Sequence, residues 1–447
     1  MDRQADRGDM PVMMSSVLDV LPLSRVHVRL LLIGGLGYLF DGLDGSSLAF
    51  FLPVLRGAWH LSGVQAGLIA SSTSQGYLIG SFLSGFLADR IGRRRIMMSA
   101  LALYCVASCL SALAQDWQSY FVLRLVCGIG TGAEAVVIIP YIAEFLPARL
   151  RGRLCGAVVG FFSFGYFLAA CLGYFVVSAA PEGWRMASVM TGLPILLLLW
   201  WRRALPESPR WLEIRGRHAE ARLVIQAFAG GRGRDRLPPD QAWAEGASPA
   251  GPGVWSARWR SRVLLCVWLW TWLFFSFYGF FSWIPSLLLK HGLNLSDSFG
   301  LSLLIFAAQI PGYFVAAWLN GPLGRRRVMI GALLLAALSA LLLVRAEGVA
   351  GLLAGAMGLS AGLNGAVAAL YAYTPELFPT RIRATAMGLA SGISRLGAIG
   401  GVFGVSLIAE RGGTAPVFAV TGAALGLAVL ALFTAAPETD NSALPEQ

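Results

Sequence analysis

Five ionisable residues fall inside long apolar stretches of the chain, where a charge is costly. They are Asp41, Asp44, Arg124, Glu134 and Arg395. An isolated charge at bilayer depth costs about 2.5–3.5 kcal/mol on insertion scales, so each of the five needs a partner or a function. Asp41 and Asp44 stand three residues apart, which places them on one face of a helix. Two close carboxylates in a medium of low dielectric favour the uptake of a proton. We therefore predict that Asp41, Asp44, Arg124 and Glu134 form a set that binds and releases protons (proton coupling).

Helical depth indicates which of these charges can meet. At about 1.5 Å per residue, Asp44 lies about 12 Å and Arg124 about 8 Å from the outer ends of their helices, so Arg124 is within reach of Asp44. Asp41 and Glu134 lie nearer the midplane. The alternative, in which the charges only pair to hold helices together, remains open. The four histidines lie in loops or termini, so carboxylates are the predicted proton carriers.

Arg395 is the central cation with no obvious carboxylate of similar depth in its own half of the chain. It lies about 18 Å into its helix and is suited to hold a substrate carboxylate through charge-assisted hydrogen bonds. Pairing with helix dipoles or carbonyls is an equally open alternative. Aromatic and amide side chains on other helices are candidates to contact a flat ring. The predicted substrate-binding residues are Gln75, Tyr278, Trp283, Gln309, Asn364, Tyr371, Tyr373 and Arg395.

The elements that must position these residues are membrane-spanning helices. Of the 447 residues, 56% are hydrophobic and 13% charged, against roughly 25% charged residues in soluble domains. Twelve apolar stretches are each long enough to cross a hydrocarbon core of about 30 Å. They cover residues 29–52, 66–88, 96–114, 119–143, 152–179, 184–201, 263–289, 298–319, 328–344, 348–374, 384–409 and 414–435. The predicted fold is an all-α membrane protein with twelve transmembrane helices.

The distribution of charge predicts the orientation. The net charge is +11, and most basic residues fall in alternate loops, counted from a cytoplasmic N-terminus. This is the positive-inside pattern, with both termini in the cytoplasm. We expect a multi-pass protein of the cell inner membrane, a monomer in the lipid bilayer that binds no nucleic acid. The first 28 residues do not resemble a cleavable signal peptide.

The chain repeats itself at one offset. Gly92-Arg93-Arg94-Arg95 returns 232 residues later at Gly324, and the Glu144-Phe-Leu-Pro segment returns at Glu376 with the same offset. Two duplicated six-helix units around a central cavity are typical of secondary transporters. The predicted organisation is a cytoplasmic N-terminus (1–28), a first bundle (29–201), a cytoplasmic central loop (202–262), a second bundle (263–435) and a cytoplasmic tail (436–447).

The segment Gly85-Phe-Leu-Ala-Asp89-Arg90-Ile-Gly92-Arg93 resembles the loop motif of the major facilitator superfamily. The resemblance implies a latch on the cytoplasmic side, in which acidic and basic residues of both repeats take part. The second copy departs from the pattern, with Gly321 in the place of Asp89. The implied gate residues are Gly85, Asp89, Arg90, Gly92, Arg93, Glu144, Arg149, Glu376 and Arg381.

Narrower motifs resemble two branches of that superfamily. Asp41-Gly-Leu-Asp44 is similar to the aromatic acid:proton symporters, and Glu134, after the glycines 128, 130 and 132 of the predicted span 119–143, is similar to the niacin permeases. The implied function is proton-coupled import of a small organic anion, an aromatic monocarboxylate such as nicotinate or a benzoate. A sugar or organic-cation carrier is the alternative, because Pro206-Glu-Ser-Pro-Arg-Trp211 is shared with those branches, and a non-transporting membrane sensor is a second. No nucleophile–base pair, phosphate loop or metal cluster is visible, so we expect no enzyme, cofactor or metal.

Overall fold

A computed structural model describes residues 18, 21–233, 254–290, 292–346 and 348–437. All regular structure in these ranges is helical. The first group of helices is α2 (Arg25–Ala58), α3 (Gly63–Ile91), α4 (Arg93–Ser111), α5 (Trp117–Ala143), α6 (Ala148–Leu172) with its π-helical extension η1 (Gly173–Val177), α7 (Gly183–Gly192), η2 (Leu193–Leu196) and α8 (Leu197–Ala204). The second group is α11 (Arg260–Phe281), α12 (Ile284–Lys290), α13 (Leu295–Ala307), α14 (Gln309–Leu319), α15 (Arg325–Arg345), α16 (Gly348–Glu376), α17 (Thr380–Gly412) and α18 (Ala415–Thr434).

Each of the twelve predicted spans is helical, but four consist of more than one piece; the fifth comprises α6 and η1. The sixth span comprises α7, η2 and α8, the seventh α11 and α12, and the eighth α13 and α14. Ten helical segments of the described chain are long and apolar enough to cross a membrane. The polar segment between the groups also contains two helices, α9 (Pro209–Ile214) and α10 (His218–Gly233), which the sequence did not predict.

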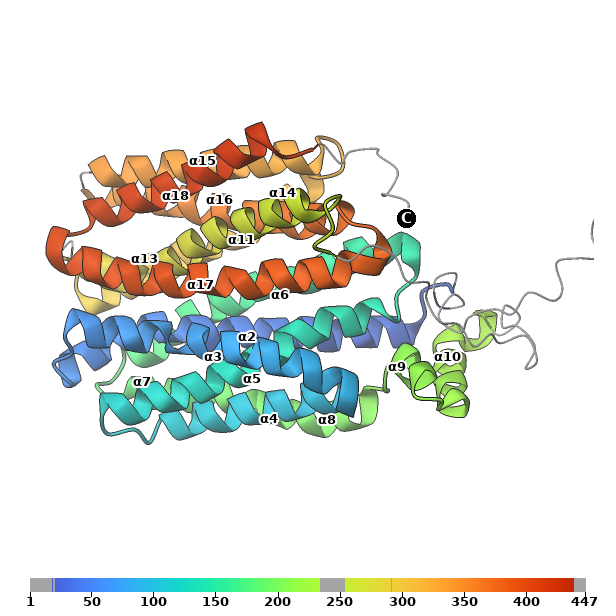
Figure 1. The fold of residues 1–447 in the computed structure, drawn as a ribbon. Coiled ribbons are helices and arrows are strands. Elements are labelled where there is room, and N and C mark those ends of the chain that lie inside the picture. Colours follow the sequence, from blue (N-terminus) through green and yellow to red (C-terminus); the bar gives the residue numbers. More distant parts are fainter. Residues whose placement is uncertain (1–17, 19–20, 234–253, 291, 347, 438–447) are drawn as a thin grey trace, which may run out of the picture.

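The two groups form two layers that lie against each other (Figure 1). In the first, α3 packs on α5 and α2 on α6; in the second, α11 packs on α17 and α15 on α16. Glycines permit the closest of these approaches: a Cβ on Gly76 would lie 2.0 Å from the Leu125 carbonyl oxygen, and one on Gly401 would lie 2.2 Å from that of Phe275. Small residues have this role in membrane helix pairs. The layers meet mainly along α3 and α17, and α6 contacts α13 and α14.

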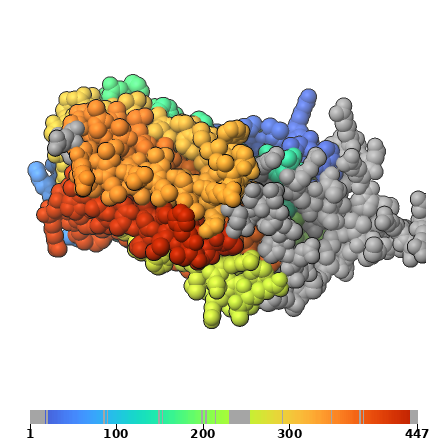
Figure 2. Space-filling model, turned by 90° about the horizontal axis from the view of Figure 1, so that it is seen from above, coloured from blue at the N-terminus to red at the C-terminus, as the bar shows by residue number. Residues whose placement is uncertain are grey.

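The outer faces carry apolar side chains that water would not solvate well. Figure 2 shows the face where α15 (orange) and α18 (red) lie, and the exposed apolar residues of these two helices include Leu334, Leu338, Leu341, Leu430 and Phe433. Large contiguous apolar surfaces of this kind indicate contact with lipid.

The repeat seen in the sequence returns in the contacts at the end of the molecule where α9 and α10 lie, here called the α10 end. Arg93 pairs with Glu144 at 3.3 Å, and Arg325 pairs with Glu376 at 2.8 Å. The Tyr141 hydroxyl donates to the Pro206 carbonyl oxygen at 2.5 Å, and the Tyr373 hydroxyl donates to that of Pro437 at 2.7 Å.

At the opposite end, here called the far end, the two layers are joined directly. The backbone N–H of Gly63, the first residue of α3, donates to Glu410 Oε1 of α17 at 3.0 Å. The Ser406 hydroxyl donates to the Gly63 carbonyl oxygen at 2.6 Å. The Phe50 ring packs on Phe299 and Phe306 with centroid distances of 5.2 and 5.3 Å. The far end is therefore closed between the layers.

Candidate substrate and proton site

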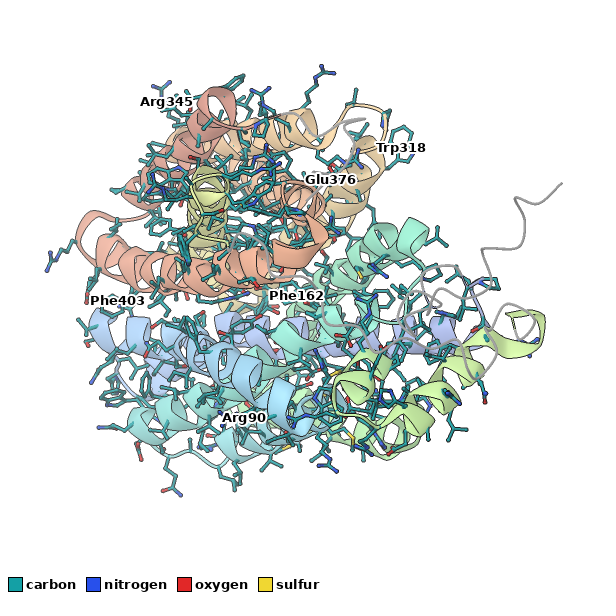
Figure 3. All side chains as sticks on the ribbon, turned by 45° about the vertical axis from the view of Figure 1, so that its right-hand side comes forward. Arg90, Phe162, Trp318, Arg345, Glu376 and Phe403 are labelled. Carbon is teal, nitrogen blue, oxygen red and sulfur yellow. The ribbon has the colours of Figure 1, made fainter. Side chains whose placement is uncertain are left out.

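A cavity lies between the two layers, near the middle of the long helices. It contains about 490 Å³ of space that no protein atom fills, part of it open solvent. Figure 3 shows Phe162, one of its lining residues, between the two groups of helices. The first group contributes Tyr38, Asp41, Tyr77, Val159, Phe162 and Ser163, and the second contributes Phe274, Phe277, Tyr278, Tyr313, Asn364, Val367, Tyr371 and Arg395. The walls are thus mostly aromatic, with one cation and one carboxyl group.

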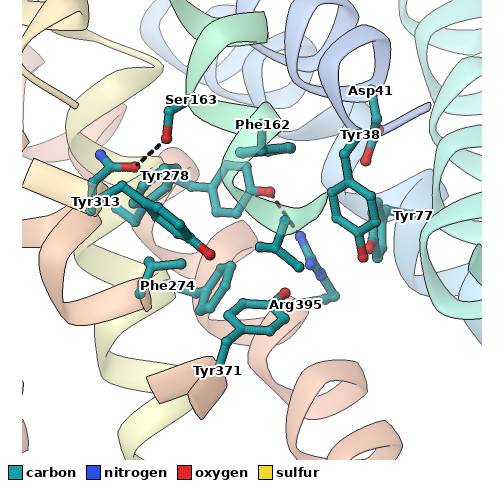
Figure 4. A pocket seen from close by; sticks show the side chains of 14 residues that line it. Tyr38, Asp41, Tyr77, Phe162, Ser163, Phe274, Tyr278, Tyr313, Tyr371 and Arg395 are labelled. Atoms are coloured by element: carbon teal, nitrogen blue, oxygen red, sulfur yellow. Dashed lines mark hydrogen bonds between the residues drawn. The ribbon is translucent and has the colours of Figure 1, made fainter. Parts of the chain in front are cut away.

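Arg395 of α17 is the cation of this cavity, and its side chain is held by aromatic groups (Figure 4). Its Nη1 donates to the Tyr278 hydroxyl at 2.9 Å. Its Cζ lies 3.7 Å from the centroid of the Tyr77 ring and 5.3 Å from that of Phe274. The residue is only 4% exposed. No ion pair between described residues joins Arg395 to a carboxylate, so the guanidinium retains capacity to bind an anion.

Asp41 and Asp44 occupy different environments although they share helix α2. Asp41 is half-buried and lines the cavity. Asp44 is fully buried, and Arg124 binds its two carboxylate oxygens at 2.9 and 3.1 Å. Ser108 and Cys127 donate to the same carboxylate at 2.7 and 3.0 Å. The pairing of Arg124 with Asp44 is as expected, but the three-residue spacing does not bring the two carboxylates into one site.

Glu134 of α5 is buried, with 3% exposure, and lies outside the cavity lining. Neither of its carboxyl oxygens has a hydrogen-bond partner among the described residues. It lies against α2 at Gly37, where an added Cβ would be 2.7 Å from Glu134 Oε1.

Comparison with known proteins identifies the architecture. The profile of the family described as "Sugar (and other) transporter" matches residues 41–447. The chain belongs to this family. It is 34% identical over 388 residues to the niacin transporter NiaP of Acinetobacter baylyi, with 86% of this chain and 88% of that one covered. It is 30% identical over 438 residues to the gallate transporter of Pseudomonas putida, with 95% of each chain covered.

Solved structures show the same fold. The xylose transporter XylE of E. coli, in a partially occluded inward-open conformation, superposes with a TM-score of 0.78 at 20% identity, covering 94% of this chain and 100% of that chain. XylE is a protein of the major facilitator superfamily. The twelve-span architecture is therefore the major facilitator fold, and the protein is a multi-pass membrane transporter.

Within this transporter fold, four of the predicted substrate-binding residues lie away from the cavity. The Trp283 indole N–H donates to the Val402 carbonyl oxygen at 2.8 Å, which fastens the break between α11 and α12 to α17. Tyr373 is bound to Pro437 at the α10 end. Gln75 donates to the Ser71 hydroxyl within α3, and Gln309 is buried at the joint of α13 and α14. These predictions are corrected because depth along a helix does not determine the direction of a side chain.

The cavity also contains residues that the sequence did not single out. Tyr38, Tyr77 and Tyr313 line it together with the predicted Tyr278 and Tyr371. The spacing of Tyr38 and Asp41 on α2, one helical turn, was an available signal for a shared face. The Ser163 hydroxyl donates to Asn364 Oδ1 at 3.4 Å, and so joins α6 of the first group to α16 of the second.

The predicted gate is described only in part. Arg93 and Glu144 pair as noted, Glu376 pairs with Arg325, and the exposed Arg90 contributes its carbonyl oxygen to an Arg215 hydrogen bond at 3.0 Å. The side chains of Gly85, Asp89, Arg149 and Arg381 lie outside the described residues. Burial raises the pKa of the Glu144 carboxyl, while the nearby Arg93 and Ser208 act in the opposite direction.

The sequence did not predict a role for Glu207, which also takes part in the contacts at the α10 end. Glu207 Oε1 accepts hydrogen bonds from the backbone N–H groups of Arg93 and Arg94 at 3.0 and 3.2 Å. It therefore caps the N-terminus of α4, where a negative charge is favoured by the helix dipole. Gly92 precedes this terminus with φ +108°, and an added Cβ would lie 2.4 Å from Glu207.

Proposed function

We propose that the protein imports a small aromatic monocarboxylate, such as nicotinate or a benzoate, together with one proton. The observation that carries the proposal is the buried Arg395 in an aromatic cavity, with no carboxylate pairing it among the described residues. A guanidinium binds a carboxylate through two parallel, charge-assisted hydrogen bonds. The tyrosine and phenylalanine walls suit a flat ring. Two relatives are named as transporters of niacin and of gallate, which supports the same substrate class.

Proton binding in this proposal belongs to Asp41. The Asp44 carboxylate already has Arg124, Ser108 and Cys127 as donors, so it serves to join α2 to its neighbours. Glu134 has no partner that would compensate a negative charge, and a buried, unpaired carboxylate is strongly disfavoured. We therefore assign Glu134 an uncharged, protonated state, so that its part in coupling is to retain a proton inside the first group of helices.

These assignments give a charge balance for the cavity. The empty carrier holds Asp41 as an anion and Arg395 as a cation. A bound monocarboxylate adds one negative charge, and a proton on Asp41 removes one. The loaded and empty carriers then have equal internal charge, so neither crosses the low-dielectric interior at an added electrostatic cost. Symport of one proton per monocarboxylate, electroneutral overall, follows.

The proposed setting is the bacterial inner membrane. We assign the α10 end, with both termini, to the cytoplasm, because the basic residues of the alternate loops favour this orientation. Residues 29–201 and 263–435 form the two bundles that rock about the cavity, 202–262 connects them in the cytoplasm, and the protein works as a monomer.

The alternatives are less well supported by the cavity. A fixed guanidinium would repel an organic cation. A sugar offers no negative charge to Arg395, although the fold is shared with a xylose transporter. A sensor would need neither Arg395 beside Asp41 in one cavity nor a proton.

A substrate panel tests the proposal. Purified protein in liposomes is given an inward proton gradient and radiolabelled nicotinate, 4-hydroxybenzoate, glucose or choline. We expect saturable uptake of an aromatic acid that collapses when the proton gradient is dissipated. Uptake of glucose or choline with no uptake of either acid would reject the substrate class.

A further inference from the structure

Arg395 is held in the middle of the molecule by a residue of the opposite group of helices. Its guanidinium lies on the face of the Tyr77 ring, with 3.7 Å from Cζ to the ring centroid. Arg395 belongs to α17 and Tyr77 to α3, the two helices along which the layers mainly meet. Tyr278 and Phe274 of α11 also contact Arg395, and they belong to the same group of helices as Arg395.

The position of Tyr77 is fixed by its own backbone. An added Cβ on Gly132 of α5 would lie 2.3 Å from the Tyr77 carbonyl oxygen, and one on Gly76 would lie 2.0 Å from the Leu125 carbonyl oxygen. The Tyr77 segment of α3 therefore lies directly against α5. The ring is presented from a rigid pair of helices, so it can hold Arg395 at a defined place.

The contact between Arg395 and the Tyr77 ring can stabilise the buried guanidinium. A guanidinium away from water needs compensation, and the face of an aromatic ring supplies it through the ring quadrupole, most strongly when the cation is desolvated. Asp41 shares the cavity, yet it forms no ion pair with Arg395 in the described structure. In the empty carrier the Tyr77 face is the closest ring face to the guanidinium and the compensating group that comes from the opposite bundle, beside the hydrogen bond to Tyr278 within its own. In the loaded carrier the substrate carboxylate supplies that compensation instead.

We infer that Tyr77 is a positioning residue that holds Arg395 across the two bundles when no anion is bound, and so lets the empty carrier return. The inference rests on the proposed role of Arg395 in substrate binding. It separates two half-cycles: crossing of the loaded carrier does not depend on Tyr77, and crossing of the empty carrier does.

The first test needs no substrate. Thermal unfolding is compared for wild type, Tyr77→Leu, Arg395→Met and the double variant, all without ligand. We expect Tyr77→Leu to lower Tm by a few degrees in the wild-type background and to have no effect in the Arg395→Met background, because the cation is then absent. Equal shifts in both backgrounds would show that Tyr77 packs without holding Arg395, whatever the substrate is.

The second test separates the crossing of the loaded carrier from the return of the empty carrier. Liposomes containing wild type, Tyr77→Leu or Tyr77→Phe are assayed for net nicotinate uptake and for exchange of labelled against unlabelled nicotinate. Because Tyr77 also lines the cavity, exchange need not be spared, and we expect Tyr77→Leu to slow net uptake about tenfold more than it slows exchange, since only the empty carrier needs this cation–π contact. Tyr77→Phe keeps the ring face and should restore net uptake. Tyr77→Met serves as a second aliphatic variant if Tyr77→Leu fails to fold.

Two results would overturn the inference. Equal loss of exchange and net uptake, with weaker nicotinate affinity, would make Tyr77 part of the substrate site. Unchanged net uptake in a folded Tyr77→Leu would show that the contact has no role in return. Absence of aromatic-acid uptake by wild type would reject the proposed function, and the thermal comparison would still decide whether Tyr77 holds Arg395.

Discussion

Two arginines are buried in the spans, and their surroundings differ in kind. Arg124 is bound by a carboxylate through two hydrogen bonds and by the Asp44 carbonyl oxygen at 3.1 Å. Arg395 is bound by a phenol and by ring faces. A guanidinium bound by a carboxylate stabilises the fold, whereas one with weaker partners can exchange them for a ligand. In the proposed function, Arg124 therefore has a structural role and Arg395 a binding role.

Substitution of Arg395 should affect nicotinate affinity according to the geometry that remains. Arg395→Lys keeps the charge but loses the planar pair of donors, so we expect affinity to fall about tenfold. Arg395→Ala removes the cation as well, and affinity should fall at least about 100-fold, since hydrogen bonds to charged groups contribute roughly 1.5–3 kcal/mol each. Equilibrium binding of radiolabelled nicotinate to purified protein measures both. Unchanged affinity in Arg395→Ala would show that the carboxylate binds elsewhere.

Substitutions of the two α2 aspartates, Asp41 and Asp44, should have different effects. Asp41→Asn should leave folding intact and abolish uphill accumulation, while exchange at equal concentrations partly survives, because only the proton site is lost. Asp44→Asn leaves Arg124 as a buried cation without its carboxylate, and breaking such a pair typically costs 3–5 kcal/mol. The main effect of Asp44→Asn should therefore be a lower Tm and a lower yield of folded protein. Proton-driven accumulation at the wild-type level in Asp41→Asn would contradict the assignment.

At this scale the sequence predicted the charged residues better than the aromatic ones. A charge inside an apolar span is conspicuous, so Asp41, Arg124 and Arg395 could be identified, and depth alone predicted the Arg124–Asp44 contact. A tyrosine in an apolar helix has no such signature. Tyr38 and Tyr77 were missed, while Trp283 and Tyr373 were wrongly placed at the cavity, because each direction depends on tertiary packing.

Among the elements, the N-terminus of α3 and the end of α17 determine how firmly the far end is closed. The Gly63 contact with Glu410 depends on the absence of a side chain, since an added Cβ would lie 1.9 Å from Glu410 Oε2. The carboxylate also lies where the dipole of α3 favours a negative charge. This contact should therefore stabilise the conformation in which the far end is closed.

Gly63→Ala should push the two layers apart at the far end. Spin labels at Val64 of α3 and Arg411 of α17 would report the separation by pulsed electron resonance, and we expect the population with the longer distance to grow. Gly57→Ala is the matched control, because nothing lies within 4 Å of an added Cβ there. An identical distance distribution in Gly63→Ala and wild type would refute the closing role.

Hydropathy predicted which segments span the membrane but not how each is built. It gave continuous helices where the structure has breaks, at Ser282–Trp283 and at Ala308, and where α6 ends in a π-helical turn. These features depend on neighbours such as Val402, which binds Trp283. The helices α9 and α10 were missed because a polar segment between apolar spans gives no hydropathy signal.

For the whole molecule, the two ends have contacts of different kinds. At the α10 end, the ion pairs Arg93–Glu144 and Arg325–Glu376 each lie within one layer. At the far end, Gly63, Ser406 and Glu410 join the layers to each other. A molecule with this asymmetry can open at the α10 end while the far end stays closed. Duplication was evident from the sequence, whereas the closed end depends on side chains that meet only in the folded chain.

Proton and substrate fluxes should be linked one to one if the cavity charges balance as proposed. With Asp41 as the only exchangeable carboxyl, uptake should rise as the outside pH falls at constant inside pH, because each inward step takes a proton from outside. Asp41→Asn should remove this dependence on pH. Persistence of the pH dependence in that variant would move the proton site to another group.

Symport of one proton with each monocarboxylate can be tested by measuring both fluxes in the same liposomes. Internal pH is followed with a trapped dye while entry of radiolabelled nicotinate is measured, with the membrane potential held at zero and then set inside-negative. Electroneutral symport with Arg395 as the carboxylate site predicts one proton per nicotinate and the same initial rate at both potentials. It predicts neither flux with Arg395→Ala. Nicotinate entry without acidification, or a rate that rises with the inside-negative potential, would contradict electroneutral symport.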